Sequence, residues 1–234
     1  MDGPLHQEIT PNRKMTTPTI SARSRYGSSE DSVTNWMLLH KRGLTWAVLA
    51  LVAIIAGFWF YQRSQAIKAQ RAESAYFQAR QSVAAGNLPL AVSDLQKVVV
   101  RYEGTRAGTQ AALSMAQVLY DQKKFKEGIA ALKKVEAKAP SDFRPSIHVL
   151  EAAGYEELKD FLAAAEQYKL AAKATEFPVD KAKFQAAAAR DYVAAGRMEE
   201  AKAIWTELVK DDTSAEAAEA RVRLGELTAK PMKI

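Results

Sequence analysis

The chain has 234 residues, a net charge of +6 and no cysteine. Residues 62–234 hold 27 Lys/Arg against 23 Asp/Glu, so this part is only slightly basic, and the charge is spread along the sequence. A nucleic-acid-binding surface needs Lys and Arg gathered on one face, so we expect no nucleic-acid partner.

Residues 1–43 form an N-terminal leader that is rich in Ser, Thr and charged residues and has little apolar surface to bury. This composition predicts a disordered segment. Its last part, from Val33 to His40, is amphipathic and could lie in the interface of a membrane. We therefore expect a disordered or interfacial leader before the first helix.

An uncharged, apolar run follows from Leu44 to Tyr61. Its 18 residues, at about 1.5 Å each in a helix, nearly match a hydrocarbon core of about 30 Å. A cleaved signal peptide has a shorter apolar core, roughly 7–15 residues, and small residues at its end, whereas this run ends in bulky aromatic side chains. The run therefore predicts a transmembrane helix over residues 44–61 that remains as an anchor.

The charges that flank this helix do not decide its orientation, because similar numbers of Lys and Arg lie on both sides. A first apolar segment behind a short leader usually leaves the leader in the cytoplasm, and Lys41 and Arg42 stand directly before the run. We expect a cytoplasmic N-terminus in a bacterial inner membrane and a periplasmic domain over residues 62–234. Within the anchor, Ala53 and Gly57 form a small-x-x-x-small pair on which another helix could pack.

Beyond Arg63 the chain is rich in alanine, and its apolar residues recur at helical spacing, which predicts an all-α domain. Four similar segments each carry two small residues twelve positions apart and a large residue four positions later. The second small residues follow one another at intervals of 37, 36 and 37. The first small residues are Ala79, Ala116, Ala152 and Ala189; the second are Ala91, Gly128, Ala164 and Ala201; the large ones are Leu95, Leu132, Tyr168 and Trp205.

Small residues at fixed positions let two helices approach closely, and a large residue fills the space beside the next pair. This pattern resembles the tetratricopeptide repeat (TPR), a helix–turn–helix unit of about 34 residues. The resemblance implies an α-solenoid of about four helix pairs, with repeats near residues 72–105, 109–142, 145–178 and 182–215. A capping helix over residues 214–230 would cover the last pair, and Thr213 and Glu216 have the spacing of a capping box at its start.

The order of leader, anchor and repeats also resembles the bacterial single-pass inner-membrane TPR proteins that accompany the Sec translocon and periplasmic chaperones. The residues that carry this resemblance are 57–61 (GFWFY) and 75–79 (AYFQA). It implies an adaptor that links the export machinery to periplasmic folding factors. A structural or assembly subunit of another inner-membrane complex remains the alternative.

Catalytic and metal centres require several ligating or titratable groups in one place, and the chain has three histidines, His6, His40 and His148. We interpret His148 as a packing residue of a repeat. The adjacent pairs Glu156-Glu157 and Glu199-Glu200 point in different directions on a helix, which indicates solvated faces. We expect no catalytic residue, no metal site and no cofactor.

A protein-binding groove is then the expected site, because the first helices of stacked TPR pairs line a concave surface. Tyrosine and arginine are common at binding hot spots, and we expect the tyrosines chosen here to be free of packing roles. The convex face and a surface near the membrane remain alternatives. The expected groove residues are Tyr76, Arg80, Gln117, Tyr120, Glu156 and Arg190.

Overall fold

The computed structural model describes residue 36 and residues 39–211 and 214–229. Most of the leader, including the expected disordered segment, lies outside these residues. The chain divides into two compact units, Met1–Trp59 and Phe60–Ile234.

The first described helix, α2, runs from Lys41 to Ala84. It contains the expected transmembrane run and continues into the first expected repeat, which begins near residue 72. No Gly or Pro interrupts the sequence between Gly57 and the end of the helix, so nothing in this stretch favours a break. In the described part of the chain, α2 alone is long and apolar enough to cross a bilayer, and its apolar window has a mean hydropathy of 1.7 and no buried residue.

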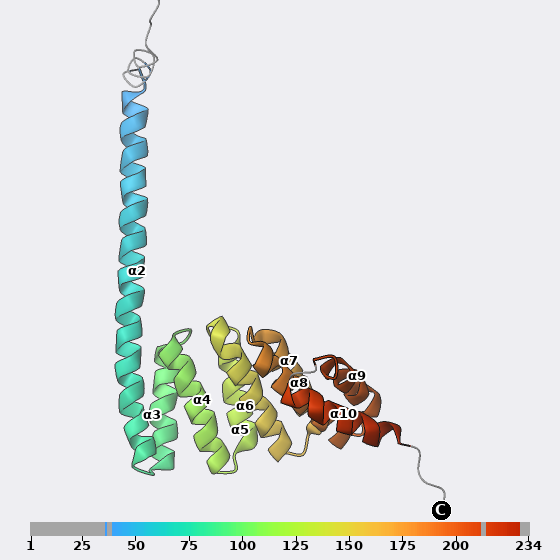
Figure 1. The fold of residues 1–234 in the computed structure, drawn as a ribbon. Helices are drawn as coiled ribbons and strands as arrows, with labels where there is room; N and C mark the ends of the chain where they lie inside the picture. Colours follow the sequence, from blue (N-terminus) through green and yellow to red (C-terminus); the bar gives the residue numbers. More distant parts are fainter. Residues whose placement is uncertain (1–35, 37–38, 212–213, 230–234) are drawn as a thin grey trace, which may run out of the picture. The chain divides into compact units, whose positions relative to one another are not determined.

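The second unit is helical throughout, and the described residues contain no strand. Helices that follow one another in sequence pack against each other from α3 to α10, and α10 also touches α8 (Figure 1). This arrangement confirms the predicted α-solenoid. The helices are α3 (Leu88–Arg101), α4 (Arg106–Asp121), α5 (Phe125–Glu136), α6 (Arg144–Glu157), α7 (Phe161–Ala174), α8 (Pro178–Ala194), α9 (Met198–Leu208) and α10 (Ala215–Thr228), with a 3-10 turn at Ser141–Phe143.

The eight small residues of the repeat pattern are all buried, as close contact between paired helices requires. Of the four large residues, Leu95, Leu132 and Trp205 are completely buried, and Tyr168 is half-buried. Alanines therefore make up much of the core, and single large side chains fill the spaces between pairs.

The two helices of each pair are joined by a turn that contains one residue with a positive φ: 72° at Gly86, 62° at Lys123, 62° at Lys159 and 76° at Gly196. These four residues recur at the repeat spacing. Glycine adopts this left-handed conformation without penalty, whereas a side chain there costs roughly 1–2 kcal/mol. Lys123 and Lys159 both adopt this conformation. The ammonium of each lysine lies close to the ring of the Phe two residues later, 5.8 Å from the ring centre for Lys123 and 5.9 Å for Lys159.

Replacing Lys159 by glycine is therefore expected to raise the free energy of unfolding by about 0.5–1 kcal/mol, after allowance for the greater freedom of glycine in the unfolded chain. Lys183→Gly, in the exposed interior of α8, is the matched control and is expected to cost about 1 kcal/mol. Denaturant unfolding of the full chain in detergent measures both. A loss of stability in Lys159→Gly would contradict the strained turn.

The start of α10 differs from the expected capping box. Ser214 is the N-cap, and its Oγ accepts a hydrogen bond from Ala217 N at 3.1 Å. The residue three positions after the cap is thus Ala217 and not Glu216, while Thr213 lies outside the described residues. The expected role of Thr213 and Glu216 as a reciprocal pair is wrong, because the helix begins one residue later than that pair requires.

Candidate partner-binding site

A hollow of about 630 Å³ lies on the first helices of the repeats. It receives side chains from α2, α4, α6 and α8 and none from the second helices. Three of the expected groove residues, Tyr76, Arg80 and Gln117, are among those that line it. The full set is Tyr76, Arg80, Gln110, Leu113, Ser114, Gln117, Ser146, Val149, Leu150 and Phe184.

The hollow, which we call the concave groove, combines an apolar floor with a polar rim. Leu113, Val149 and Phe184 are half-buried, whereas Arg80 and Gln117 are exposed. Such a surface can bury apolar side chains of a peptide segment and offer hydrogen bonds and one positive charge at its edge. That a partner binds here remains a prediction.

Tyr76 contacts two other residues that line the groove. Its hydroxyl lies 2.9 Å from Ser114 Oγ, which joins α2 to α4, and the Arg80 guanidinium lies 6.0 Å from its ring centre. Tyr76 is partly buried and packs against the hydrophobic core, so the expectation that it has no packing role is wrong, although it also lines the hollow.

Tyr120 is a packing residue, which corrects the expectation that it is free to bind a partner. Its hydroxyl donates a hydrogen bond to Leu150 O at 3.0 Å, and burial raises its pKa above the usual value of 10.0. The ring occupies space that Gly128 and Gly154 leave open, because a Cβ on either glycine would overlap it. Sequence alone could not show this contact, since Gly154 belongs to the next repeat.

Glu156 and Arg190 lie apart from the residues that line the concave groove. Glu156 accepts a hydrogen bond from the Tyr168 hydroxyl at 3.4 Å, and burial raises its pKa. Arg190 forms an ion pair of 2.8 Å with Glu219 of α10 and lines a separate pocket of about 260 Å³ beside Trp205. Arg190 therefore ties the capping helix to α8.

The Ala53 and Gly57 pair lies on the apolar part of α2. Both residues are exposed, and a Cβ on Gly57 would meet no atom within 4 Å. The surface around them is open to another helix, and that such a helix packs there remains a prediction.

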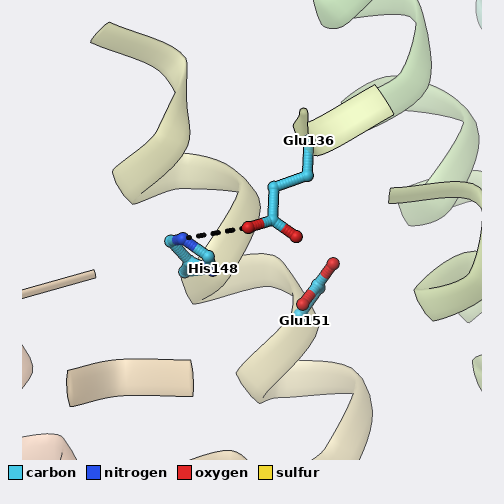
Figure 2. Close-up of side chains that lie close together, drawn as sticks. All are labelled: Glu136, His148 and Glu151. Atoms are coloured by element: carbon cyan, nitrogen blue, oxygen red, sulfur yellow. Dashed lines mark ion pairs between the residues drawn. The ribbon is translucent and has the colours of Figure 1, made fainter. Parts of the chain in front are cut away.

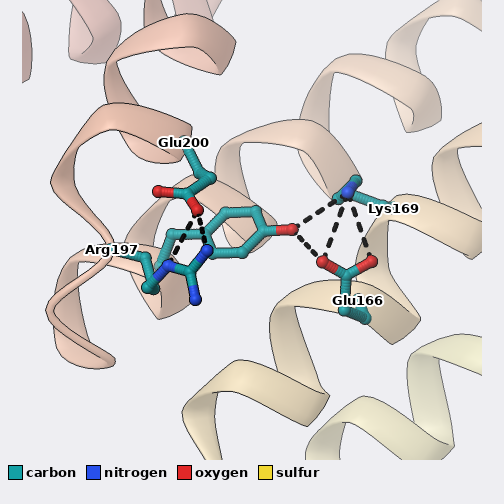
Figure 3. Close-up of polar contacts among 5 residues, drawn as sticks. Glu166, Lys169, Arg197 and Glu200 are labelled. Atoms are coloured by element: carbon teal, nitrogen blue, oxygen red, sulfur yellow. Dashed lines mark hydrogen bonds and ion pairs between the residues drawn. The ribbon is translucent and has the colours of Figure 1, made fainter.

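The charged residues near the fourth repeat pair with one another. Lys169 lies 3.2 Å from Glu166 and donates a hydrogen bond to the Tyr192 hydroxyl, while Arg197 pairs with Glu200 across one turn (Figure 3). The hydrogen bond from Tyr192 is the main cause that lowers the pKa of Glu166. The hydrogen bonds that Tyr192 makes with Lys169 and Glu166 connect α8 to α7.

The structure also places polar groups in the interior that the sequence analysis did not single out, Glu151 and Asp191. Glu151 is completely buried beside His148, and burial, then the charge of Glu136, raises its pKa from 4.5 to about 7. His148 and Glu151 are three positions apart on one helix face, which is the only sign of this cluster in the sequence. Glu136 joins them from α5, and that neighbour depends on the fold.

Asp191 on α8 is 6% exposed, and its Oδ2 has no hydrogen-bond partner. Burial, with the nearby charge of Glu156, raises its pKa from 3.8 to about 7, and Arg190 opposes the shift. Since the pKa is higher in the folded chain than in the unfolded chain, the folded state gains stability from the protonated form. That gain is complete below about pH 4 and is lost as the pH rises through about 7.

We therefore expect Asp191→Asn to be more stable than the wild type at about pH 8, by about 2–4 kcal/mol, with a smaller difference at about pH 5. The measurement is denaturant unfolding of both full-length proteins in detergent across this range. Equal pH dependence in the two proteins would show that Asp191 is ionised in the fold without penalty.

The helix pairs, their small-residue contacts and their common groove define a helical-repeat scaffold. The sequence matches the family described as "Tetratricopeptide repeat-like domain" over residues 35–229, and the chain belongs to that family. Domains of this kind generally mediate protein–protein interactions and are typically non-catalytic scaffolds.

Two solved structures share the fold. The nearly identical TPR-like repeats attributed to a kinesin light chain of Podosopora anserina superpose with a TM-score of 0.50 at 18% identity, over 67% of this chain and 85% of that one. A tetratricopeptide repeat protein from Parabacteroides merdae gives a TM-score of 0.52 at 14% identity, over 68% of this chain and 60% of that one. No curated protein matches the sequence.

Proposed function

We propose that this protein is a membrane-anchored adaptor whose concave groove binds a segment of a partner protein. The observation that carries the proposal is the hollow of about 630 Å³ that four first helices line with an apolar floor and a polar rim. Its lining comes from several repeats, so an extended or helical segment would contact all of them at once.

The anchor in this proposal is the apolar part of α2, with the N-terminus in the cytoplasm and the repeats in the periplasm of a bacterium. Its exposed apolar side chains and the Lys41-Arg42 pair before them support this topology. Protease added to spheroplasts is expected to digest the repeats and to spare the leader. Protected repeats would overturn the orientation.

The partners in this proposal are components of the export machinery and periplasmic folding factors, on the basis of the resemblance in the anchor and first helix. A structural or assembly subunit of another inner-membrane complex is the second candidate, favoured by the open surface around Ala53 and Gly57. A photo-crosslinker placed at either position separates the two. Translocon components among the products support the adaptor, and a single stable complex of another kind supports the subunit.

The role of the groove in partner binding can be tested with a substitution that places a large side chain in it. Gln117 is exposed at the rim, so Gln117→Trp adds bulk to the hollow without entering the core. Loss of access to a hot spot is expected to cost about 2 kcal/mol of binding free energy or more. Recovery of native partners with the full chain should fall, and circular dichroism should stay unchanged.

The matched control is Gln96→Trp. Gln96 is exposed on α3, a second helix that contributes nothing to the groove. It should recover partners at the wild-type level. Equal recovery by both variants would move the binding surface to the convex face or to the anchor.

A further inference from the structure

Three ligating side chains meet where the second repeat contacts the third. Glu136 is the last residue of α5, and His148 and Glu151 lie one turn apart on α6 (Figure 2). One ligating atom from each lies within 4.8 Å of the other two, and His148 Nε2 is 3.7 Å from Glu136 Oε1.

Glu151 is the unusual member of this cluster. It is completely buried, and neither carboxylate oxygen has a hydrogen-bond partner. A buried carboxylate without partners is costly, because it has lost its hydration and gained nothing in return. A cation between the three side chains would supply the missing interaction.

The imidazole of His148 is oriented as a metal ligand would be. Its Nδ1 lies 2.9 Å from Gln167 Oε1 of α7, so with the amide in this orientation Nδ1–H is the donor. The lone pair is then on Nε2, on the side of Glu136. Metal-ligating histidines usually donate their second ring N–H to an oxygen in this manner, which fixes both tautomer and ring direction.

The cluster can be reached from outside, and positively charged side chains lie near it. A pocket of about 430 Å³ opens onto Glu136 and His148, with Arg144 and Lys173 among its lining residues. Lys133, whose charge also acts on Glu151, donates a hydrogen bond of 2.7 Å to the Tyr155 hydroxyl. Glu136 retains 39% exposure and can adjust its side chain to close the triangle.

We propose that Glu136, His148 and Glu151 form a site for a divalent transition-metal ion, with Zn²⁺ as the best fit. One imidazole nitrogen and two carboxylate oxygens are ligands that Zn²⁺ accepts, and the pocket leaves a fourth position for water. Imidazole disfavours Mg²⁺ and Ca²⁺, which prefer oxygen ligands alone. The site goes beyond the proposed adaptor function and departs from our expectation of no metal.

The ion would join the second helix of repeat two to the first helix of repeat three. Because the ligands come from both helices, an ion that binds only the folded arrangement stabilises this interface by mass action. The groove residues Ser146 and Val149 are carried by the same helix, α6, so the bound metal would also hold one wall of the groove.

The test is a titration of the untagged full-length protein in detergent with Zn²⁺ alone, followed by calorimetry and by thermal unfolding. We expect one tight site and a rise in the unfolding temperature, with no such rise on addition of Mg²⁺. Glu151→Gln keeps the shape of the buried side chain and removes its charge, and it should lose the tight site. Glu157→Gln, exposed on the same helix, is the matched control and should bind as the wild type does.

The role of Gln167 as a positioning residue is tested separately. Gln167→Ala is expected to weaken Zn²⁺ binding by about 10–100-fold, and Gln167→Glu, which retains an acceptor for Nδ1–H, to recover most of the affinity. Co²⁺ bound in place of Zn²⁺ reports the ligand set through its visible absorption, independently of stability. The proposal is overturned if the wild type shows no tight site, or if Glu151→Gln binds Zn²⁺ as tightly and with the same Co²⁺ spectrum.

Discussion

Trp205→Ala is expected to lower the free energy of unfolding of the repeat domain by about 3–5 kcal/mol, the largest effect of any substitution considered. Trp205 is completely buried in α9 and belongs to a cluster with Ala165, Ala189 and Ala220 from three other helices. Its removal leaves a cavity that these small neighbours cannot fill, because alanines have no side-chain atoms to move inward. Denaturant unfolding of the full chain in detergent measures the loss.

Trp205→Phe tests how much of the stability comes from the packing of the aromatic ring and how much depends on the indole N–H. The buried indole Nε1 has no hydrogen-bond partner, so phenylalanine removes an unsatisfied donor while it keeps an aromatic ring. We expect a smaller loss of stability than with alanine, because phenylalanine fills part of the space that the indole occupies. A loss as large as that of alanine would mean that the indole nitrogen has a partner in solution.

Leucine in place of Ala164 or Ala201 is expected to cost about 1–3 kcal/mol through overpacking. Both alanines are completely buried at the close contact of a helix pair, Ala164 in α7 and Ala201 in α9. The added carbons have no free volume there, so the paired helices must separate. The unfolding temperature of the full chain should fall in each variant.

Ala203→Leu provides the matched control, because Ala203 is exposed on α9 two residues from Ala201. Its unfolding temperature should stay close to that of the wild type. Unchanged stability in both buried variants would mean that the helix register is different from the one described.

The repeat architecture could be predicted because each repeat obeys the same local rule. Two helices that approach closely need small residues at fixed positions, and Ala91, Gly128, Ala164 and Ala201 mark them in the sequence. The turns follow the same period, so even the lysines in the left-handed conformation fall at predictable places. The apolar segment over residues 44–61 could also be predicted, because the length of a helix follows from its number of residues and can be compared with the thickness of the hydrocarbon core.

The site residues were only partly predictable. The position of a residue in a repeat indicates which face of the helix it lies on, but it does not indicate which side chains of other repeats will contact it. Tyr76, Arg80 and Gln117 reach one hollow, as their positions suggested. Tyr120 has an equivalent position, yet the adjacent glycine of α6 lets its ring turn inward to bond Leu150 O. A glycine in one repeat thus decides the role of a tyrosine in another.

The helix pairs and the apolar segment could be predicted from the sequence, because they depend on residues close together in the chain. Which side chains share an environment depends on how the repeats pack against one another. Glu136 meets His148 and Glu151 across two repeats, and the pKa of Glu151 rises to about 7 because the fold removes it from water beside that second carboxylate. Burial and neighbouring charge act through space, so no spacing in the sequence records them.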